Sequence, residues 1–101
     1  MRRLLTLTVS IIAALALAGE SAAHDWTGVA RCESGGRWNL YTGNGYEGGL
    51  QFAHSTWLAY GGRRYAYHAH QASKWQQILI AERVLRGQGI GAWPVCGRYL
   101  R

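Results

Sequence analysis

Apolar residues first recur at helical spacing near residue 26. Trp26, Val29 and Ala30 fall on one face of a helix, Asp25 stands before them as an N-cap, and Gly35-Gly36 follows as a stop signal. This pattern predicts a short amphipathic helix that begins after Asp25 and ends before the two glycines.

The longest periodic stretch of the chain begins after residue 73. Ser73 followed by Gln76 is a capping-box pattern, and Gly87 is a candidate stop signal. Together they predict the longest helix of the chain, with its inward face supplied by apolar residues. These are Trp75, Ile78, Leu79, Ala81, Val84 and Leu85.

Between the two helices the pattern changes to aromatic segments separated by turn residues. Residues 38–41 and 46–52 flank Thr42-Gly43-Asn44-Gly45, and Asn-Gly between such segments is a strong hairpin signal. Ser55 then caps a predicted short helix that runs to Tyr60, and 63–72 has the composition of a loop. We therefore expect one α+β domain that is mostly helical.

The first 23 residues form a predicted signal peptide. Arg2 and Arg3 precede an apolar run at 4–18, and Ser21-Ala22-Ala23 places small residues where a signal peptidase reads them. The 15-residue run is shorter than the ~20 residues of a membrane-spanning helix, although a retained anchor is the alternative. We expect export, no stable membrane insertion, and a mature domain over 24–101.

A domain of 78 residues buries a thin core and gains much from a covalent link. Cys32 and Cys96 are the only cysteines, and export would place them in an oxidising compartment. A disulfide between them is the prediction, with two free thiols as the alternative. A metal site is disfavoured, because two cysteines without clustered histidines do not complete a tetrahedral site.

Charge narrows the class of partner. Removing Arg2, Arg3 and Glu20 from 11 basic and 5 acidic residues leaves nine and four, a net charge of +5 over 24–101. A basic domain favours a polyanion such as nucleic acid, an anionic membrane or a bacterial wall. Export disfavours nucleic acid, and we expect none to be bound.

Glu33 is the carboxylate that the pattern singles out for chemistry. It follows Cys32 at the end of the first predicted helix, ahead of the glycines and the aromatic hairpin. Glycosidic cleavage needs a carboxylic acid that stays protonated near neutral pH, and an apolar or aromatic wall provides this. An ordinary exposed residue at a helix end is the alternative.

A series of short segments along 24–101 carries a resemblance to a known family. The first segments are Asp25-Trp26, Val29-Ala30, Cys32-Glu33-Ser34-Gly35-Gly36, Trp38, Thr42-Gly43-Asn44-Gly45-Tyr46 and Gly48-Gly49-Leu50-Gln51-Phe52. They continue with Ser55-Thr56-Trp57, Tyr60-Gly61-Gly62, Gln76-Gln77-Ile78, Ala81-Glu82-Arg83-Val84-Leu85 and Gly91-Ala92-Trp93-Pro94-Val95-Cys96. In these segments the sequence resembles the resuscitation-promoting factor domain.

The resemblance implies a lysozyme-like fold that cleaves the β-1,4 bond between N-acetylmuramic acid and N-acetylglucosamine and restarts growth of dormant cells. The family's catalytic glutamate falls on Glu33, and its paired cysteines fall on Cys32 and Cys96. Substrate-groove positions fall on Tyr46, Gln51, Thr56 and Gln88, with Asn44 a weaker correspondence.

Two positions depart from the family pattern. Residue 41 is tyrosine where asparagine is usual, and residue 47 is glutamate where tyrosine is common. Both flank the predicted turn, so they are expected to alter the specificity of the substrate groove. Glu47 itself is expected to be a solvated strand residue.

The count of acids bears on the mechanism. A two-carboxylate glycosidase places its second carboxylate about 5 to 9.5 Å from the acid. If Glu33 alone occupies the groove, a lytic transglycosylase is favoured, in which the C6 hydroxyl of muramic acid closes an anhydro ring. The alternatives are hydrolysis with Glu47 as the second carboxylate, or a wall-binding module without activity. A cationic membrane-active peptide is disfavoured, because the long helix belongs to a cross-linked domain.

The remaining expectations concern aromatic, histidine and arginine side chains. Trp26, Trp57 and Trp75 occupy core-like helical positions, whereas Trp38 and Trp93 are candidates for lining a groove. His68 and His70 are expected to be polar surface, with no metal and no cofactor. The arginines at 63–64 and at the two ends of 98–101 are expected to face the bacterial wall or solvent. We expect a secreted monomer that binds peptidoglycan strands, with a wall endopeptidase as a candidate protein partner.

Overall fold

The computed structural model describes residues 24–101, and the predicted signal peptide at 1–23 lies outside them. Helix α2 (Trp26–Ser34) forms where the apolar spacing predicts it. The Asp25 carboxylate caps it by accepting a hydrogen bond from the Gly28 N–H at 2.8 Å. Gly35 ends the helix in the left-handed conformation, at φ 67°. The prediction for this helix is confirmed.

Helix α4 (Lys74–Gln88) confirms the predicted capping box. The Ser73 hydroxyl accepts from the Gln76 N–H at 3.1 Å, and the Gln76 side chain accepts from the Ser73 N–H at 3.0 Å. The helix ends at Gln88, close to the predicted stop near Gly87, and Gly89 is its C-cap. A Cβ at residue 87 would lie 2.6 Å from the Tyr60 hydroxyl oxygen, so this glycine permits a close approach instead of ending the helix.

The sheet differs from the predicted hairpin. Strands β1 (Tyr46–Glu47) and β2 (Phe52–Ala53) pair antiparallel across residues 48–51, with Tyr46 opposite Ala53. Only an isolated bridge between Tyr41 and Glu47 crosses the Asn44-Gly45 turn.

A buried side chain from α4 explains this pairing. Gln77 accepts from the Gly49 N–H at 2.9 Å and donates to the backbone oxygens of Trp38 and Ala72 at 2.9 and 3.1 Å. A Cβ at Gly48 would lie 2.5 Å from the Gln77 side-chain oxygen. The segment therefore packs closely onto α4, a tertiary contact that local turn preferences do not include.

Helix α3 (His54–Ala59) begins two residues earlier than predicted. Ala53 occupies the N-cap position and no side chain caps the helix, so the assignment of Ser55 as the cap is wrong. The region predicted as loop contains two 3₁₀ turns, η1 (Gly62–Arg64) and η2 (Ala69–Gln71). Trp57 holds this region by donating from its indole N–H to the Ala66 backbone oxygen at 2.9 Å.

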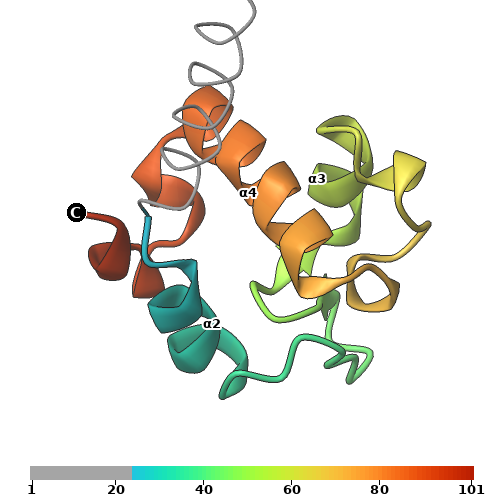
Figure 1. Ribbon diagram of the computed structural model, residues 1–101, viewed down its shortest axis with the longest axis horizontal. Helices are drawn as coiled ribbons and strands as arrows, with labels where there is room; N and C mark the ends of the chain where they lie inside the picture. Colours follow the sequence, from blue (N-terminus) through green and yellow to red (C-terminus); the bar gives the residue numbers. More distant parts are fainter. Residues whose placement is uncertain (1–23) are drawn as a thin grey trace, which may run out of the picture.

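Figure 1 shows α4 crossing the middle of the molecule, with α3 on one side and α2 with the C-terminal segment on the other. The C-terminal segment contains η3 (Ile90–Ala92) and η4 (Cys96–Leu100), and η4 packs on α2. The Cys32–Cys96 disulfide joins these two elements, which confirms the predicted pairing. The mostly helical α+β class is confirmed as well. Within residues 24–101, no helix has the length and apolar character needed to cross a bilayer.

Burial of the tryptophans only partly follows the prediction. Trp26 and Trp57 lie in the core as predicted, but the prediction for Trp75 is wrong, because 65% of its surface is exposed. The inward face of α4 is the stripe through Gln77, Ile80 and Val84. That stripe lies on a different side of the helix from Trp75, which instead has the Lys74 ammonium 5.1 Å from its ring centre.

Glu82 is a buried acid that the sequence pattern did not single out. Its carboxylate accepts from the indole N–H of Trp26 at 2.7 Å and lies 2.8 Å from the Nδ1 of His24. These contacts connect α4 to the start of α2. Glu82 therefore has a structural position in the core, away from the groove described next.

Candidate functional site

A groove runs over the surface between the end of α2, the sheet and the C-terminal segment. Its larger part is a hollow of about 410 Å³, and its smaller part has a volume of about 90 Å³. The two parts share Tyr46, Gln51, Ala92 and Trp93, so they form a continuous groove. The larger part also contains Glu33, Pro94, Val95 and Cys96, and the smaller part also contains Phe52, Ala53, Thr56, Val84 and Gln88.

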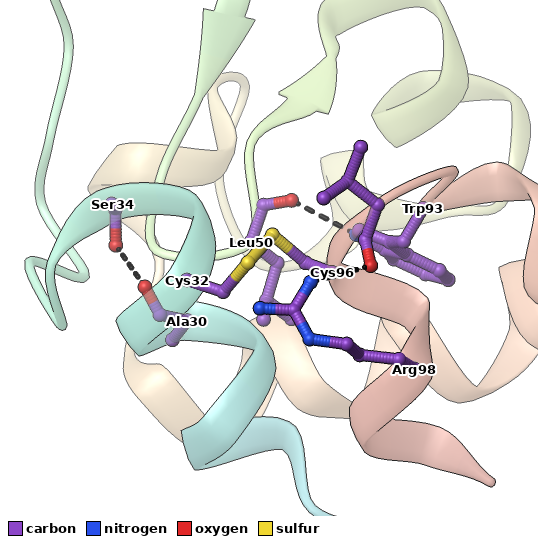
Figure 2. Close-up of a disulfide and its surroundings, with 8 residues drawn as sticks. Ala30, Cys32, Ser34, Leu50, Trp93, Cys96 and Arg98 are labelled. Atoms are coloured by element: carbon purple, nitrogen blue, oxygen red, sulfur yellow. Dashed lines mark hydrogen bonds between the residues drawn. A yellow bond between two sulfur atoms is a disulfide. The ribbon is translucent and has the colours of Figure 1, made fainter.

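Glu33 lies in the last turn of α2, where the helix end is well fixed. The Ser34 hydroxyl donates to the Ala30 backbone oxygen at 2.9 Å, and Cys32 is bonded to Cys96 (Figure 2). Glu33 is half-buried, and this burial raises the pKa of its carboxyl above the ordinary value of 4.5. The side chain therefore keeps a proton at a higher pH than an exposed glutamate does.

Four of the five predicted substrate-binding residues line this groove. Tyr46 and Gln51 line both parts, and Thr56 and Gln88 line the smaller part. Asn44 lines neither part. Its side-chain oxygen accepts from the Tyr46 N–H at 3.0 Å, so it shapes the turn that leads into β1.

Gln51 has an unusual backbone for a groove residue. It is the one non-glycine residue in the described range with positive φ, at 54°. This left-handed conformation is disfavoured for residues with a Cβ and tends to occur at functional sites. The side-chain amide donates to the Gly48 backbone oxygen at 3.0 Å, which holds the turn beside the groove.

Of the two tryptophans proposed for the groove, only Trp93 contacts it. Its ring is almost wholly buried, and its indole N–H donates to the Leu50 backbone oxygen at 3.0 Å (Figure 2). Trp38 packs under Gly49, where a Cβ would lie 2.6 Å from its ring. Trp93 thus forms a fixed apolar wall of the groove. Trp38 lies outside the groove and packs against the backbone at Gly49, between β1 and β2.

The expectation that Glu47 is solvated is wrong, since 3% of its surface is exposed. Burial alone would raise its pKa. Hydrogen bonds from His68, from the Ala69 N–H and from His54 oppose this effect, and the pKa of Glu47 is lowered. Neither His68 nor His70 is fully exposed, so the expectation of simple polar surface is also wrong. The sequence pattern did not reveal these contacts, because His68 and Ala69 lie more than twenty residues from Glu47 in the chain.

The acids of the described chain have separate environments. Asp25 caps α2, Glu82 holds Trp26 and His24, and Glu47 is held by histidines. Among residues 24–101, Glu33 is the one acidic residue that lines the groove. The groove therefore offers a single carboxyl group with a raised pKa beside polar side chains and a fixed aromatic wall.

Comparison with known proteins supports a family assignment. The family described as the transglycosylase-like domain matches residues 20–96. Over 76 residues the chain is 60% identical to the resuscitation-promoting factor Rpf1 of Corynebacterium glutamicum, covering 75% of this chain and 39% of that protein. It is 58% identical over 89 residues to RpfA of Mycobacterium tuberculosis, covering 88% of this chain and 22% of that protein.

A third relative is the resuscitation-promoting factor Rpf of Micrococcus luteus, which is 44% identical over 104 residues. That match covers 92% of this chain and 45% of the relative. The chain thus spans less than half the length of each of these three relatives. The matched range includes the groove and both cysteines. The chain belongs to the transglycosylase-like, resuscitation-promoting factor family of domains.

Proposed function

We propose that this protein cleaves the β-1,4 bond between N-acetylmuramic acid and N-acetylglucosamine in peptidoglycan as a lytic transglycosylase, with Glu33 as its catalytic acid. The observation that carries this proposal is the single groove carboxyl, because no second acid of the described residues stands beside it. The matching family, described as a transglycosylase-like domain, supports the same class of reaction.

In the proposed mechanism, protonated Glu33 donates its proton to the oxygen of the leaving sugar as the glycosidic bond breaks. The resulting carboxylate then accepts the proton of the C6 hydroxyl of muramic acid. That hydroxyl oxygen bonds to C1 and closes a 1,6-anhydro ring, so water is not consumed. Tyr46, Gln51, Thr56 and Gln88 would position the glycan strand, and Trp93 would pack against it.

The products of purified peptidoglycan test this mechanism. A transglycosylase releases fragments with anhydromuramic ends, which mass spectrometry finds one water lighter than the reducing fragments of a hydrolase. Reducing ends alone would replace the proposal with hydrolysis. Binding to the wall without any release would favour a non-catalytic module.

The proposed site of action is outside the cytoplasm. The leader pattern at 1–23 and the charge of +5 over 24–101 suit export to an anionic wall. We further propose a role in resuscitation of dormant cells, as the relatives' names state for those proteins. N-terminal sequencing of protein from the culture medium should begin within a residue or two of His24, whereas Met1 would contradict processing.

The raised pKa of Glu33 predicts the pH dependence of the enzyme. The reaction begins with a protonated acid, so activity should fall as pH rises through the pKa of Glu33, at a pH above 4.5. Because the folded state holds this proton more tightly than the unfolded chain, stability should also fall as pH rises from 4.5 through the raised pKa.

Two pH series check this prediction. In the first, the alkaline limb of cleavage activity should lie above pH 4.5. In the second, the melting temperature of Glu33→Gln should rise relative to that of the wild type as pH increases through this window, because only the wild type loses the contribution of the Glu33 proton. A difference in melting temperature that stays constant with pH would show that the Glu33 proton has no coupling to folding.

A further inference from the structure

Three of the four histidines of the chain gather around the Glu47 carboxylate. His54 begins α3, His68 precedes η2, and His70 lies within η2. The ring centres of His54 and His68 are 4.5 Å apart, and those of His68 and His70 are 5.4 Å apart. We call Glu47, His54, His68 and His70 the histidine cluster.

The carboxylate at the centre of the cluster is firmly held. One oxygen lies 2.7 Å from the Nδ1 of His68, and the other accepts from the Ala69 N–H at 2.9 Å. The Nδ1 of His54 lies 3.2 and 3.3 Å from the two oxygens. A buried carboxylate is thus surrounded by imidazole rings from two other segments of the chain.

The histidine cluster also contains nitrogen atoms that the fold does not use. Within residues 24–101, the Nε2 of His54 and the Nδ1 of His70 are buried and have no hydrogen-bond partner. Buried polar atoms without partners are uncommon and costly, so each calls for an explanation. The His70 ring is nevertheless well placed, stacked on Tyr41 with ring centres 4.4 Å apart.

These atoms lie close enough to share an ion. Glu47, His68 and His70 each offer one ligand atom, and the three atoms lie within 4.8 Å of one another. Zinc bonds to imidazole nitrogen and carboxylate oxygen at about 2.0 to 2.2 Å, so the three side chains would close on one ion by moving less than about 1 Å.

We propose that Glu47, His68 and His70 bind a divalent transition-metal ion of the zinc class, with the fourth position taken by water or His54. Two imidazole nitrogens and one carboxylate oxygen suit zinc better than the hard cations Mg²⁺ and Ca²⁺, which prefer oxygen alone. The ion takes the place of the hydrogen between the His68 nitrogen and Glu47, and the neutral His68 ring then carries its proton on the other ring nitrogen.

The two departures from the family pattern both fall at this place. Glu47 is the carboxylate ligand, and Tyr41 stacks on His70 and forms the backbone bridge to Glu47. Tyr41 and Glu47 therefore meet at the cluster, although β2, α3 and η1 separate them from His68 and His70 in sequence.

The ion site and the groove lie on opposite faces of β1. Successive strand residues point to opposite sides, and Tyr46 lines the groove while Glu47 enters the histidine cluster. A bound ion would therefore connect β1 to the segment around η2 and stabilise the fold behind the groove. It takes no part in the proposed cleavage.

Zinc binding to the purified, chelator-treated protein tests the proposal. Dialysis against zinc chloride should leave one zinc per chain by elemental analysis and raise the melting temperature, whereas magnesium should do neither. Cobalt in place of zinc should give the visible absorption of a tetrahedral site. His70→Ala should weaken zinc binding at least about tenfold, because even residues that only support a ligand have effects of this size.

The matched control is His24→Ala, which removes a histidine that contacts Glu82 and lies outside the cluster. It should bind zinc like the wild type. Because His70→Ala removes the ring that stacks on Tyr41, its metal-free melting temperature should fall modestly, and zinc binding is compared at a temperature at which both proteins are folded. If that variant does not fold, His68→Asn must show the same loss of zinc. Zinc below one per chain, or zinc lost equally from the His24 and His70 variants, overturns the proposal.

Discussion

Replacing Glu33 with glutamine is expected to slow glycan cleavage at least about a hundredfold while the fold and wall binding persist. Glutamine keeps the size and polarity of the side chain but has no acidic proton for the leaving oxygen. Glu33 is half-buried and, in the structure described, its carboxylate makes no hydrogen bond to the rest of the protein. The loss should therefore appear in kcat and leave the circular dichroism spectrum unchanged.

Release of soluble fragments from purified peptidoglycan measures the effect, and sedimentation with insoluble wall measures binding. Glu33→Asp is a useful companion, because it keeps the acid but draws it back by one methylene. It should retain more activity than Glu33→Gln and less than the wild type. Near-normal release by Glu33→Gln would show that the acid has been assigned to the wrong residue.

Glu47→Gln separates the two chemical alternatives. The transglycosylase proposal expects a modest effect, because Glu47 faces the histidine cluster and not the groove. If the enzyme instead hydrolyses the bond with Glu47 as the second carboxylate, Glu47→Gln should lose most of its activity. The variant also weakens contacts to His68 and Ala69, so activity is compared at a temperature at which both proteins are folded.

Loss of the Cys32–Cys96 disulfide is expected to lower the free energy of unfolding by about 4 kcal/mol. The two residues are 64 positions apart, so the bond restricts nearly the whole unfolded domain. For a domain of this size, such a loss corresponds to a fall in melting temperature on the order of 20 °C. Thermal unfolding with and without reductant measures it.

Reduction should also affect the groove. Cys96 lines its larger part, and Cys32 precedes Glu33 on α2, so the bond connects the candidate acid to the opposite wall. The double variant Cys32→Ala with Cys96→Ala is the control, because its melting temperature should not respond to reductant. Two reactive thiols in unfolded, unreduced protein, or a wild-type melting temperature that reductant leaves unchanged, would contradict the prediction.

Features that depend on neighbouring residues were predictable from the sequence. The Asp25 cap and the Gly35 stop define α2, and the Ser73 and Gln76 pair defines the start of α4. Their hydrogen bonds span three or four residues, so the pattern contains both partners. The disulfide was predictable for a different reason, since two cysteines in a small domain that is expected to be exported allow one pairing.

The family and the groove residues were predictable through the resemblance, because it supplied positions that no local pattern identifies. Glu33, Tyr46, Gln51, Thr56 and Gln88 come from separate elements and turns, yet all of them line one groove. Composition and position alone suggested Glu33, Trp38 and Trp93 for the groove, and Trp38 lines neither part of it. Asn44 shows the limit of the transfer, because its side chain stabilises the turn outside the groove.

Only the tertiary structure decided the environments of Glu47, Gln77 and Trp75. Glu47 is buried because His68 and Ala69, more than twenty residues away, supply hydrogen bonds to it. Gln77 draws the turn at Gly49 onto α4 and so shifts the strand pairing away from the predicted hairpin. Trp75 stays exposed because the core covers another side of α4. In each case the deciding partner is distant in sequence, and its contribution exists only once the chain has closed the loop between them.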